Sequence, residues 1–533
     1  MNAAEPYLDI LAASPHRLAV CEPGGRSITY SDLRRRVIAL AQDLREQGFT
    51  AGDRALMLVP NGVEFAASAL AVFLLGGTPV LLEPGLGDPV FLSRVKAAGP
   101  KWLLLHPLLA WIGRIPGARA LLKKREIEVP PIPKLPGMRT VIVSPKKLDR
   151  LQRQVPEDAT FEIANRDDSD DGILVFTGGT TSAPKGVRLC HGALSHYLSH
   201  ISSAITGMHL ENFLADTPQQ VLYALRLGKT AYTTKGRTKK RAATVHSLAT
   251  AGKVDAYFGS PYVWMEMMAS GSGGTMPATL KTVLLGGAPV TREFLRLLRN
   301  KLHSDTKVLV LYGMTEAGPV CAVSAEDKLA YTGEGDLVGA PLHGVTLEID
   351  GGGEIGEVIV QSPSLYSGYL HDTERGDEGF RTGDLGQLIE VNTTQMLLLL
   401  GRRKDMIIRA GVNIYPASFE ENLRAIKNNR GDRLVREAAM IGVWNPATQD
   451  EAVVLCIEPL PGADVDRAAL EKDAASVCGI DARPDHLLVL DAIPVTGRQN
   501  KVDKNALRQI AVKRLGLELM PDHRPQSVAG AQS

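Results

Sequence analysis

The chain has 533 residues, of which 44% are hydrophobic and 22% charged, a balance typical of globular proteins. This length exceeds what one hydrophobic core usually serves, so we expect two or more domains. The 60 basic and 59 acidic residues nearly cancel to a formal net charge of +1, which gives no reason to expect nucleic-acid binding.

The cysteines and the N-terminal residues bear on location. The five cysteines are far apart and form no C-x-x-C pair, which argues against a zinc site or a disulfide framework and suits a reducing cytoplasm. The N-terminus includes Glu5 and Asp9 and lacks the basic and apolar regions of a signal peptide. No apolar run reaches the length of about eighteen residues that a membrane span needs. We therefore expect a soluble, cytoplasmic protein.

The first hundred residues alternate helix and strand patterns. Apolar residues at helical spacing predict a helix over 33–44, with Ser31 as its cap and Gly48 as its stop. Two short buried strands and an apolar helix between them are predicted at 55–59, 79–82 and 63–75. This alternation predicts an α/β fold with a parallel sheet covered by helices.

Two segments carry basic clusters. Residues 108–138 contain five prolines, Trp111 and the run Lys123-Lys124-Arg125. This composition fits a membrane-surface or acyl-chain-entry patch, but the short apolar stretch and the nearby glutamates favour a solvated surface loop. The run 235–241 (KGRTKKR) is interpreted in the same way, with a phosphate-bearing partner as the alternative.

A glycine-rich loop follows a predicted buried strand at 173–176. Such a loop suits phosphate, because glycine backbone can approach closely, hydroxyl and N–H groups donate, and one lysine adds charge. It is not a Walker A loop, since the glycine spacing differs and no Ser or Thr follows the lysine. The alternative is an ordinary hairpin turn leading into a strand at 187–189. The candidate phosphate ligands are Thr177, Gly178, Gly179, Thr180, Thr181 and Lys185.

Two further predicted strands end in small residues. The strand at 284–285 runs into Gly286-Gly287-Ala288, and the strand at 308–311 runs into Tyr312-Gly313-Met314-Thr315-Glu316. Ligands of open α/β sheets bind beyond the carboxyl ends of the strands. Three such turns at one edge therefore predict a ligand site there.

The second half of the chain reads as antiparallel and then α+β. Strands are predicted near 347–349, 356–360, 382–384 and 396–400, and later near 438–443 and 452–457. A change of composition at 401–405 marks a boundary. We predict a domain over 1–403, a second over 404–520, and a disordered tail over 521–533.

With these pieces in place, the chain resembles the adenylate-forming superfamily of acyl-CoA synthetases, adenylation domains and luciferases. The resemblance extends over residues 28–504 and depends on five ordered motifs: TGGTTSAPKG, LYGMTE, TGD, GRRKDMIIRAGVNIYP and Lys501-Val502-Asp503. It implies a large N-terminal domain of layered α/β sheets with a β-rich subdomain, and a small mobile α+β C-terminal domain. It also implies that a carboxylate reacts with ATP to give acyl-AMP, and that the acyl group then passes to a nucleophile.

The resemblance assigns roles around the phosphates and adenosine. The residues from Thr177 to Thr181, with Lys185, would hold the β- and γ-phosphates. Glu316 resembles the Mg²⁺ ligand of the family, which fits the preference of this ion for carboxylate and phosphate oxygens, and Thr315 would donate to the α-phosphate. The adenine and ribose contacts would come from Tyr312, Gly313, Gly287, Ala288, Asp384 and Arg402. Core packing is the alternative for Tyr312, and a turn carboxylate is the alternative for Asp384.

The resemblance also assigns roles in the C-terminal domain. Lys501 would bind the carboxylate and the bridging oxygen in the first half-reaction. Lys404 matches the hinge around which the domain rotates. Arg409 and Gly411 lie in the loop that would line the thiol tunnel in the second conformation.

Two segments depart from the family pattern. The stretch 494–501 has one residue more than usual and an Asn before the lysine, which affects the expected geometry of this loop. At the position where peptide-synthetase domains place an Asp for the substrate amine, this chain has Ala215, with Asp216 one residue away. An α-amino acid substrate is therefore disfavoured.

The acyl pocket is predicted from the same edge of the sheet. Its candidate lining, which includes Tyr257, Tyr262 and Gly286 together with 219–223, is mostly uncharged. This favours an apolar carboxylic acid such as a fatty acid.

The acceptor has three readings. The run 401–416 is closest to thioester-forming ligases and favours coenzyme A or the phosphopantetheine of an acyl carrier protein. Arg498-Gln499-Asn500-Lys501 instead resembles the ending of β-lactone synthetases, in which the β-hydroxyl of the substrate attacks. A non-catalytic ATP- and acyl-binding protein is the third reading, and the intact Lys501, Glu316 and Asp384 argue against it.

Overall fold

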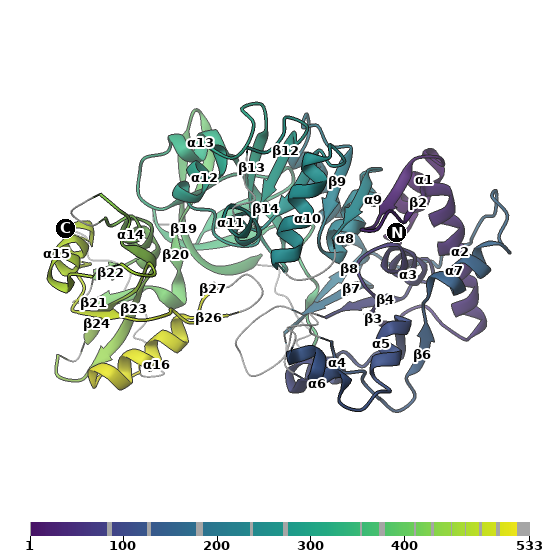
Figure 1. The fold of residues 1–533 in the computed structure, drawn as a ribbon, viewed down its shortest axis with the longest axis horizontal. Coiled ribbons are helices and arrows are strands. Elements are labelled where there is room, and N and C mark those ends of the chain that lie inside the picture. The colour runs from purple at the N-terminus through teal and green to yellow at the C-terminus, as the bar shows by residue number, and fades with distance from the viewer. Residues whose placement is uncertain are drawn as a thin grey trace. The chain divides into compact units, whose positions relative to one another are not determined.

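The chain divides into two compact units, which are described separately (Figure 1). Unit 1 contains residues 1–327, 340–347 and 360–380, and unit 2 contains residues 328–339, 348–359 and 381–533. The computed structural model describes residues 2–82, 88–124, 129–176, 185–234, 238–269, 275–351, 354–371, 379–409, 412–427, 431–448, 450–463, 465–478, 482–496 and 501–519.

One sheet of unit 1 has the order β18-β8-β7-β4-β3-β5-β6. The strands from β7 to β6 in this order are parallel, whereas β8 and β18 are antiparallel to their neighbours. Their bounds are β3 (Arg54–Leu58), β4 (Thr78–Leu81), β5 (Trp102–Leu105), β6 (Arg139–Ile142), β7 (Asp171–Phe176), β8 (Gly186–Cys190) and β18 (Gly368–Tyr369).

A second sheet of unit 1 has the order β15-β14-β13-β12-β11-β9-β10-β1-β2. The strands from β13 to β1 in this order are parallel, so their carboxyl ends meet at one edge. The bounds are β1 (Leu18–Cys21), β2 (Ser27–Thr29), β9 (Asn212–Ala215), β10 (Thr230–Thr233), β11 (Ala256–Gly259), β12 (Thr282–Leu285), β13 (Lys307–Met314), β14 (Gly318–Ser324) and β15 (Asp336–Pro341).

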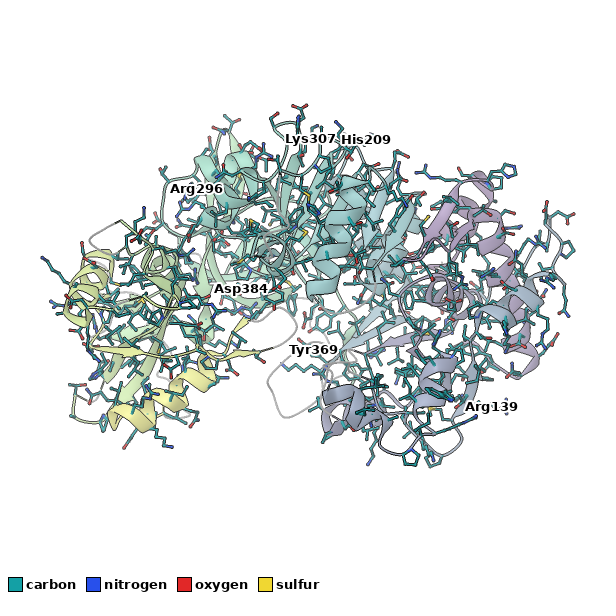
Figure 2. The ribbon with its side chains drawn as sticks, viewed as in Figure 1. Arg139, His209, Arg296, Lys307, Tyr369 and Asp384 are labelled. Carbon is teal, nitrogen blue, oxygen red and sulfur yellow. The ribbon has the colours of Figure 1, made fainter. Side chains whose placement is uncertain are left out.

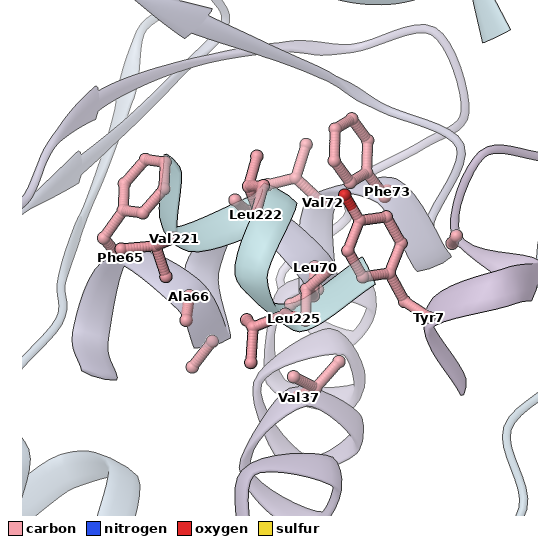
Figure 3. Packing of buried hydrophobic residues seen from close by; sticks show 14 of the residues in the cluster. Tyr7, Val37, Phe65, Ala66, Leu70, Val72, Phe73, Val221, Leu222 and Leu225 are labelled. Carbon is pink, nitrogen blue, oxygen red and sulfur yellow. The ribbon is translucent and has the colours of Figure 1, made fainter. Parts of the chain in front are cut away.

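Helices connect these strands and form the core of unit 1. They are α1 (Glu5–Ala13), α2 (Tyr30–Glu46), α3 (Val63–Leu74), α4 (Asp88–Ala98), α5 (Pro107–Ile112), α6 (Ala118–Lys124), α7 (Pro145–Gln152), α8 (His191–Ala204), α9 (Pro218–Arg226), α10 (Thr238–Thr250), α11 (Pro261–Ala269), α12 (Arg292–Arg299) and α13 (Ala325–Ala330). Every residue of α3 is buried. Figure 3 shows side chains of α3 packed with Tyr7, Val37, Val221, Leu222 and Leu225. Each buried Leu or Phe contributes roughly 1.5–3 kcal/mol relative to an exposed one, which fixes α3 at the centre of the unit.

Unit 2 contains the antiparallel part of the chain and its C-terminal α+β part. In one of its sheets the order is β16-β17-β19-β20-β15, and in another it is β23-β24-β25. The bounds are β16 (Thr346–Ile349), β17 (Gly356–Gln361), β19 (Phe380–Val391), β20 (Thr394–Arg402), η1 (Arg403–Asp405), β21 (Ile407–Arg409), β22 (Val412–Ile414), α14 (Pro416–Arg424), β23 (Val435–Asn445), β24 (Asp450–Pro459), α15 (Arg467–Cys478), β25 (His486–Val489), β26 (Val495–Thr496), β27 (Lys501–Val502) and α16 (Lys504–Leu515).

The α/β class and the order of elements agree with the prediction, with two local corrections. The cap of α2 is Thr29 and not Ser31, because Thr29 has extended backbone and its Oγ1 accepts a hydrogen bond from Asp32 N at 3.1 Å. The segment 108–138, predicted as a surface loop, contains much of α5 and all of α6.

Two predictions concern the chain as a whole. Among the described residues, no helix is long and apolar enough to cross a membrane. The domain boundary at Lys404 falls inside unit 2 and stays a prediction. The predicted tail at 521–533 lies outside the described residues.

Candidate functional site

The glycine-rich loop joins two antiparallel strands. In the β7–β8 pair, Val175 lies opposite Val187 and Phe176 lies opposite Gly186, so the predicted hairpin is present. Lys185 directly precedes β8 and is exposed. The other predicted phosphate ligands, which are Thr177, Gly178, Gly179, Thr180 and Thr181, lie outside the described residues.

Thr315 and Glu316 lie at the tip of the β13–β14 hairpin. Met314 pairs with Gly318, which leaves only the three residues 315–317 in the turn. Glycine is required on both sides of this turn. A Cβ atom on Gly313 would collide with the carbonyl oxygen of Gly318, and Gly318 itself has a φ of +74°. The hairpin therefore presents Thr315 and Glu316 as half-buried side chains on a tightly closed turn.

Tyr369 brings the two predicted phosphate-site motifs together. Its hydroxyl donates a hydrogen bond to Glu316 Oε1 at 3.0 Å, and Lys185 Nζ lies 5.3 Å from the centroid of its ring. The second distance is within the range of a cation–π interaction. Tyr369 is placed there because β18 pairs with β8, with Tyr369 opposite Val187. Sequence reasoning missed this residue (Figure 2).

The segment before Tyr369 supports the same turn. Tyr366 N donates to the carbonyl oxygen of Glu316 at 2.7 Å, and Ser364 Oγ donates to the carbonyl oxygen of Ala317 at 2.7 Å. The Tyr366 ring meets the Tyr369 ring edge-on, with 5.0 Å between centroids. Burial, and next the Glu316 charge, raise the pKa of Tyr369 well above its usual value. The hydroxyl therefore remains a protonated donor at neutral pH.

The carboxyl ends of β11, β12 and β13 carry the predicted adenine contacts. Gly286 is buried, and a Cβ atom there would lie 3.1 Å both from the carbonyl oxygen of Leu311 and from the Phe258 ring. Gly287 is exposed with a φ of +78°, and Ala288 and Tyr312 are half-buried. Because Leu285 pairs with Val310 in the parallel register, these turns lie side by side at one sheet edge.

Polar groups at the ends of β9 and β11 are already paired. The hydroxyl of buried Tyr257 donates to Asp216 Oδ2 at 3.0 Å. Gln220 Nε2 donates to the carbonyl oxygen of Phe258 at 2.8 Å, while its Oε1 accepts from Asp216 N at 2.8 Å. Tyr262, near the start of α11, is half-buried. These contacts satisfy the carboxylate nearest to the position where amino acid-activating relatives place an Asp.

The predicted ribose ligands of unit 2 pair with each other. Asp384 on β19 lies opposite Arg402 on β20, and Arg402 Nε lies 2.6 Å from Asp384 Oδ1. Asp384 N also donates to Thr382 Oγ1 at 3.0 Å. Asp384 is buried, whereas Arg402 is exposed. The antiparallel register thus orients one carboxylate and holds its charge beside a guanidinium (Figure 2).

Lys501 belongs to the same charged group in unit 2. Desolvation of its ammonium, followed by the positive charge of Arg402, lowers the pKa of Lys501, while Asp384 raises it. The side chain retains exposed surface, so we give more weight to the neighbouring charges than to burial. Residues 497–500, which precede Lys501, lie outside the described residues.

Lys404 lies between two anchored neighbours in η1. Arg403 Nη1 pairs with the buried carboxylate of Glu357 at 2.9 Å, and Arg508 of α16 pairs with Asp405 Oδ1 at 3.2 Å. Lys404 itself is exposed. This arrangement, with side-chain anchors on either side of one exposed residue, is compatible with a short hinge.

The predicted thiol-tunnel residues are described only in part. Arg409 Nη1 donates to the carbonyl oxygen of Arg483 at 2.7 Å and to Asp485 Oδ2 at 3.0 Å. Its guanidinium is therefore held by the end of the segment that leads into β25. Gly411 lies outside the described residues.

A metal-binding role for Glu316 can be tested on its contacts. Tyr369 engages Oε1, and within the described residues Oε2 accepts no hydrogen bond. No group of three potential metal ligands occurs among the described His, Cys, Asp and Glu side chains. One hard carboxylate without further protein ligands fits Mg²⁺, which usually completes its coordination with phosphate oxygens and water.

The fold and these motifs agree with a family comparison, and the chain belongs to the AMP-binding enzyme family, whose model matches residues 9–370. Among curated relatives, feruloyl-CoA synthase from Amycolatopsis sp is 28% identical over 93% of this chain and 96% of its own length. A 2-succinylbenzoate–CoA ligase from Bacillus cereus is 25% identical over 86% of this chain and 92% of its own length.

A solved structure agrees at the level of the fold. The amide bond synthetase McbA from Marinactinospora thermotolerans aligns with a TM-score of 0.76 and 26% identity, over 95% of this chain and 99% of that one. The family, the relatives and this structure confirm the adenylate-forming resemblance and the predicted enzyme class, an AMP-forming acid–thiol ligase.

Proposed function

We propose that this enzyme activates an apolar carboxylic acid with ATP and then transfers the acyl group to a thiol. A carboxylate oxygen of the acid attacks the α-phosphorus of ATP, the bond to the bridging oxygen breaks, and pyrophosphate leaves. The thiol sulfur then attacks the acyl carbonyl carbon, and AMP leaves as the thioester forms. The main support is the contact of Tyr369 with both Lys185 and Glu316, because it joins the two phosphate-site motifs of the family.

The first step brings anions together, so positive charge and oriented donors must be in place beforehand. Lys185 would bind terminal phosphate oxygens, and Thr315, on its closed turn, would donate to the α-phosphate. Mg²⁺ at Glu316 would neutralise phosphate charge. Lys501 would bind the attacking carboxylate and the bridging oxygen, and Asp384 would accept hydrogen bonds from the ribose hydroxyls.

The paired polar groups at the ends of β9 and β11 favour an apolar acid. Asp216 is engaged by Tyr257 and Gln220, so a substrate amine would have to displace these contacts. Fatty acids are the class we favour. The names of the curated relatives point to aromatic acids, feruloyl and 2-succinylbenzoyl, and these compounds form the second arm of the test.

The test is ATP–pyrophosphate exchange with purified enzyme, Mg²⁺ and a panel of fatty acids, cinnamic-type acids and aromatic dicarboxylic acids. We expect exchange with apolar acids and none with Lys501→Ala. Folded enzyme that exchanges with no acid in the panel would refute the proposal. Exchange only with aromatic acids would retain adenylation and remove the fatty acid assignment.

The acceptor is tested by mass spectrometry of the products. We favour a thiol, either coenzyme A or a pantetheinylated carrier, over the β-hydroxyl of the substrate, because the run 401–416 resembles thioester-forming ligases. The enzyme receives a β-hydroxy fatty acid with and without thiol, and a parallel reaction contains an amine. A thiol-independent product lighter than the acid by one water would establish the β-lactone alternative. An amide without thioester would overturn the thiol assignment.

A further inference from the structure

Helix α5 is apolar on both of its faces. On the inner face, Ile112 is buried and Leu109 packs against the core around Phe91. On the outer face, Leu108 is 54% exposed and Trp111 is 60% exposed, the largest value among the exposed large hydrophobic residues of the described chain. Such exposure of a tryptophan is unusual unless the surface is an interaction site.

The exposed surface continues along the chain after α5. Arg114 N bonds to the Trp111 carbonyl, and Ala118 N bonds to the Ile115 carbonyl, so the connection to α6 is a series of closed turns. In this connection Ile115 is exposed, and Leu121 of α6 is 56% exposed. We call the four side chains Leu108, Trp111, Ile115 and Leu121 the α5–α6 surface (Figure 1).

Local contacts hold the α5–α6 surface in place. The side chain of His106 caps α5 by accepting a hydrogen bond from Leu108 N at 3.3 Å. A Cβ atom on Gly113 would collide with the Ile132 side chain, so this end of α5 lies directly on the core. Arg119 of α6 bonds to Asp88 at the start of α4 at 2.7 Å. The outer face is thus a defined part of the fold.

The charge around this surface has one sign. Residues 106–124 include Arg114, Arg119, Lys123 and Lys124 and no acidic residue. Arg119 is neutralised by Asp88, whereas Arg114 is exposed on the turn between Trp111 and Ile115. Apolar side chains headed by a tryptophan and flanked by basic residues match the interface of a bilayer that carries negative headgroups.

We propose that the α5–α6 surface binds the surface of anionic membranes, with α5 lying in the plane of the interface. A second copy of the chain fits less well, because an isologous contact would place the same basic residues against each other. Binding would be peripheral and reversible, since few side chains enter the interface. It goes beyond the proposed reaction and does not depend on it.

The test is co-sedimentation of the full-length enzyme with vesicles of phosphatidylcholine alone or with a quarter phosphatidylglycerol. We expect binding to the anionic vesicles, and a blue shift of tryptophan fluorescence that the Trp111→Ser variant lacks. Leu108→Ser combined with Trp111→Ser should lower the partition coefficient roughly tenfold or more. Replacing Arg114, Lys123 and Lys124 by Gln should lower it by about a hundredfold and reduce its salt dependence.

The matched control is Leu297→Ser, which removes a comparably exposed leucine from α12 and should leave binding unchanged. Wild-type binding that the Leu108/Trp111 variant retains, or equal binding to neutral and anionic vesicles, would overturn the proposal. A dimer in light scattering that the same variant dissociates, without vesicle binding, would assign the surface to a second copy instead.

Discussion

The hydroxyl of Tyr369 donates a hydrogen bond to Glu316 Oε1 at 3.0 Å, across 53 positions of sequence. The same tyrosine ring faces Lys185, which belongs to the glycine-rich loop motif. One side chain on a two-residue strand thus orients the proposed metal ligand while contacting the proposed phosphate ligand. Tyr369 is a positioning residue in this scheme, and its removal separates the two effects.

Tyr369→Phe should weaken Mg²⁺-dependent nucleotide binding while keeping the ring beside Lys185. Loss of a hydrogen bond to a charged group corresponds to roughly tenfold to a hundredfold in affinity. The measurement is calorimetric titration with a non-hydrolysable ATP analogue, with Mg²⁺ and with EDTA. We expect the loss only when Mg²⁺ is present.

The control for Tyr369→Phe is Tyr331→Phe, whose hydroxyl donates to the carbonyl oxygen of Glu334 at an exposed turn. This variant should bind the analogue like the wild type. Equal losses for Tyr369→Phe with and without Mg²⁺ would contradict the orienting role.

Lys501→Ala should abolish acyl-AMP formation and largely spare transfer from supplied acyl-AMP, because the proposed contact exists only in the first half-reaction. Loss of one transition-state contact lowers the rate by ~10² or more. Single-turnover assays of each half-reaction measure this. Lys513→Ala, at an exposed lysine of α16, serves as the control. Equal losses in both half-reactions would argue against the assigned role.

Lys404→Pro should have the opposite effect, sparing adenylation and slowing transfer. Proline fixes φ and removes a backbone donor, which restricts rotation at this position. Lys404→Ala removes the same side chain without that restriction and should leave both steps near wild type. The same half-reaction assays apply, and a proline variant with normal transfer would place the hinge elsewhere.

His191 should make the stability of unit 1 depend on pH. Its buried ring accepts a hydrogen bond from Ala3 N at 3.1 Å, and burial, followed by the charge of Arg166, lowers its pKa to about 4. Below an unfolded-state pKa of about 6.5, the unfolded chain binds the proton more readily. Stability is therefore full above this value and falls as the pH decreases toward 4, by about 3 kcal/mol in total.

The measurement is thermal or urea unfolding across this pH range. His191→Asn retains an acceptor for Ala3 N but cannot take up the proton, so its stability should change less between pH values of about 7 and 4. Parallel curves for the two proteins would show that the titration of His191 does not contribute.

The sequence alone determined the local elements and the chemistry of the turns. Period and length placed α3, β3 and the β7–β8 hairpin, because hydrogen bonds within an element depend on neighbouring residues. The turn 312–316 was identified as a ligand turn because its residue types suit phosphate. The ordered motifs were sufficient for the family, which the comparisons confirm.

Only the tertiary structure decided which distant residues meet. Tyr369 reaches Glu316 through the pairing of β18 with β8, and Arg402 reaches Asp384 through the antiparallel register of β19 and β20. His191 meets Ala3 across 188 positions. Such contacts depend on strand order and register, which result from packing of the whole core, and a local pattern carries no information about that packing.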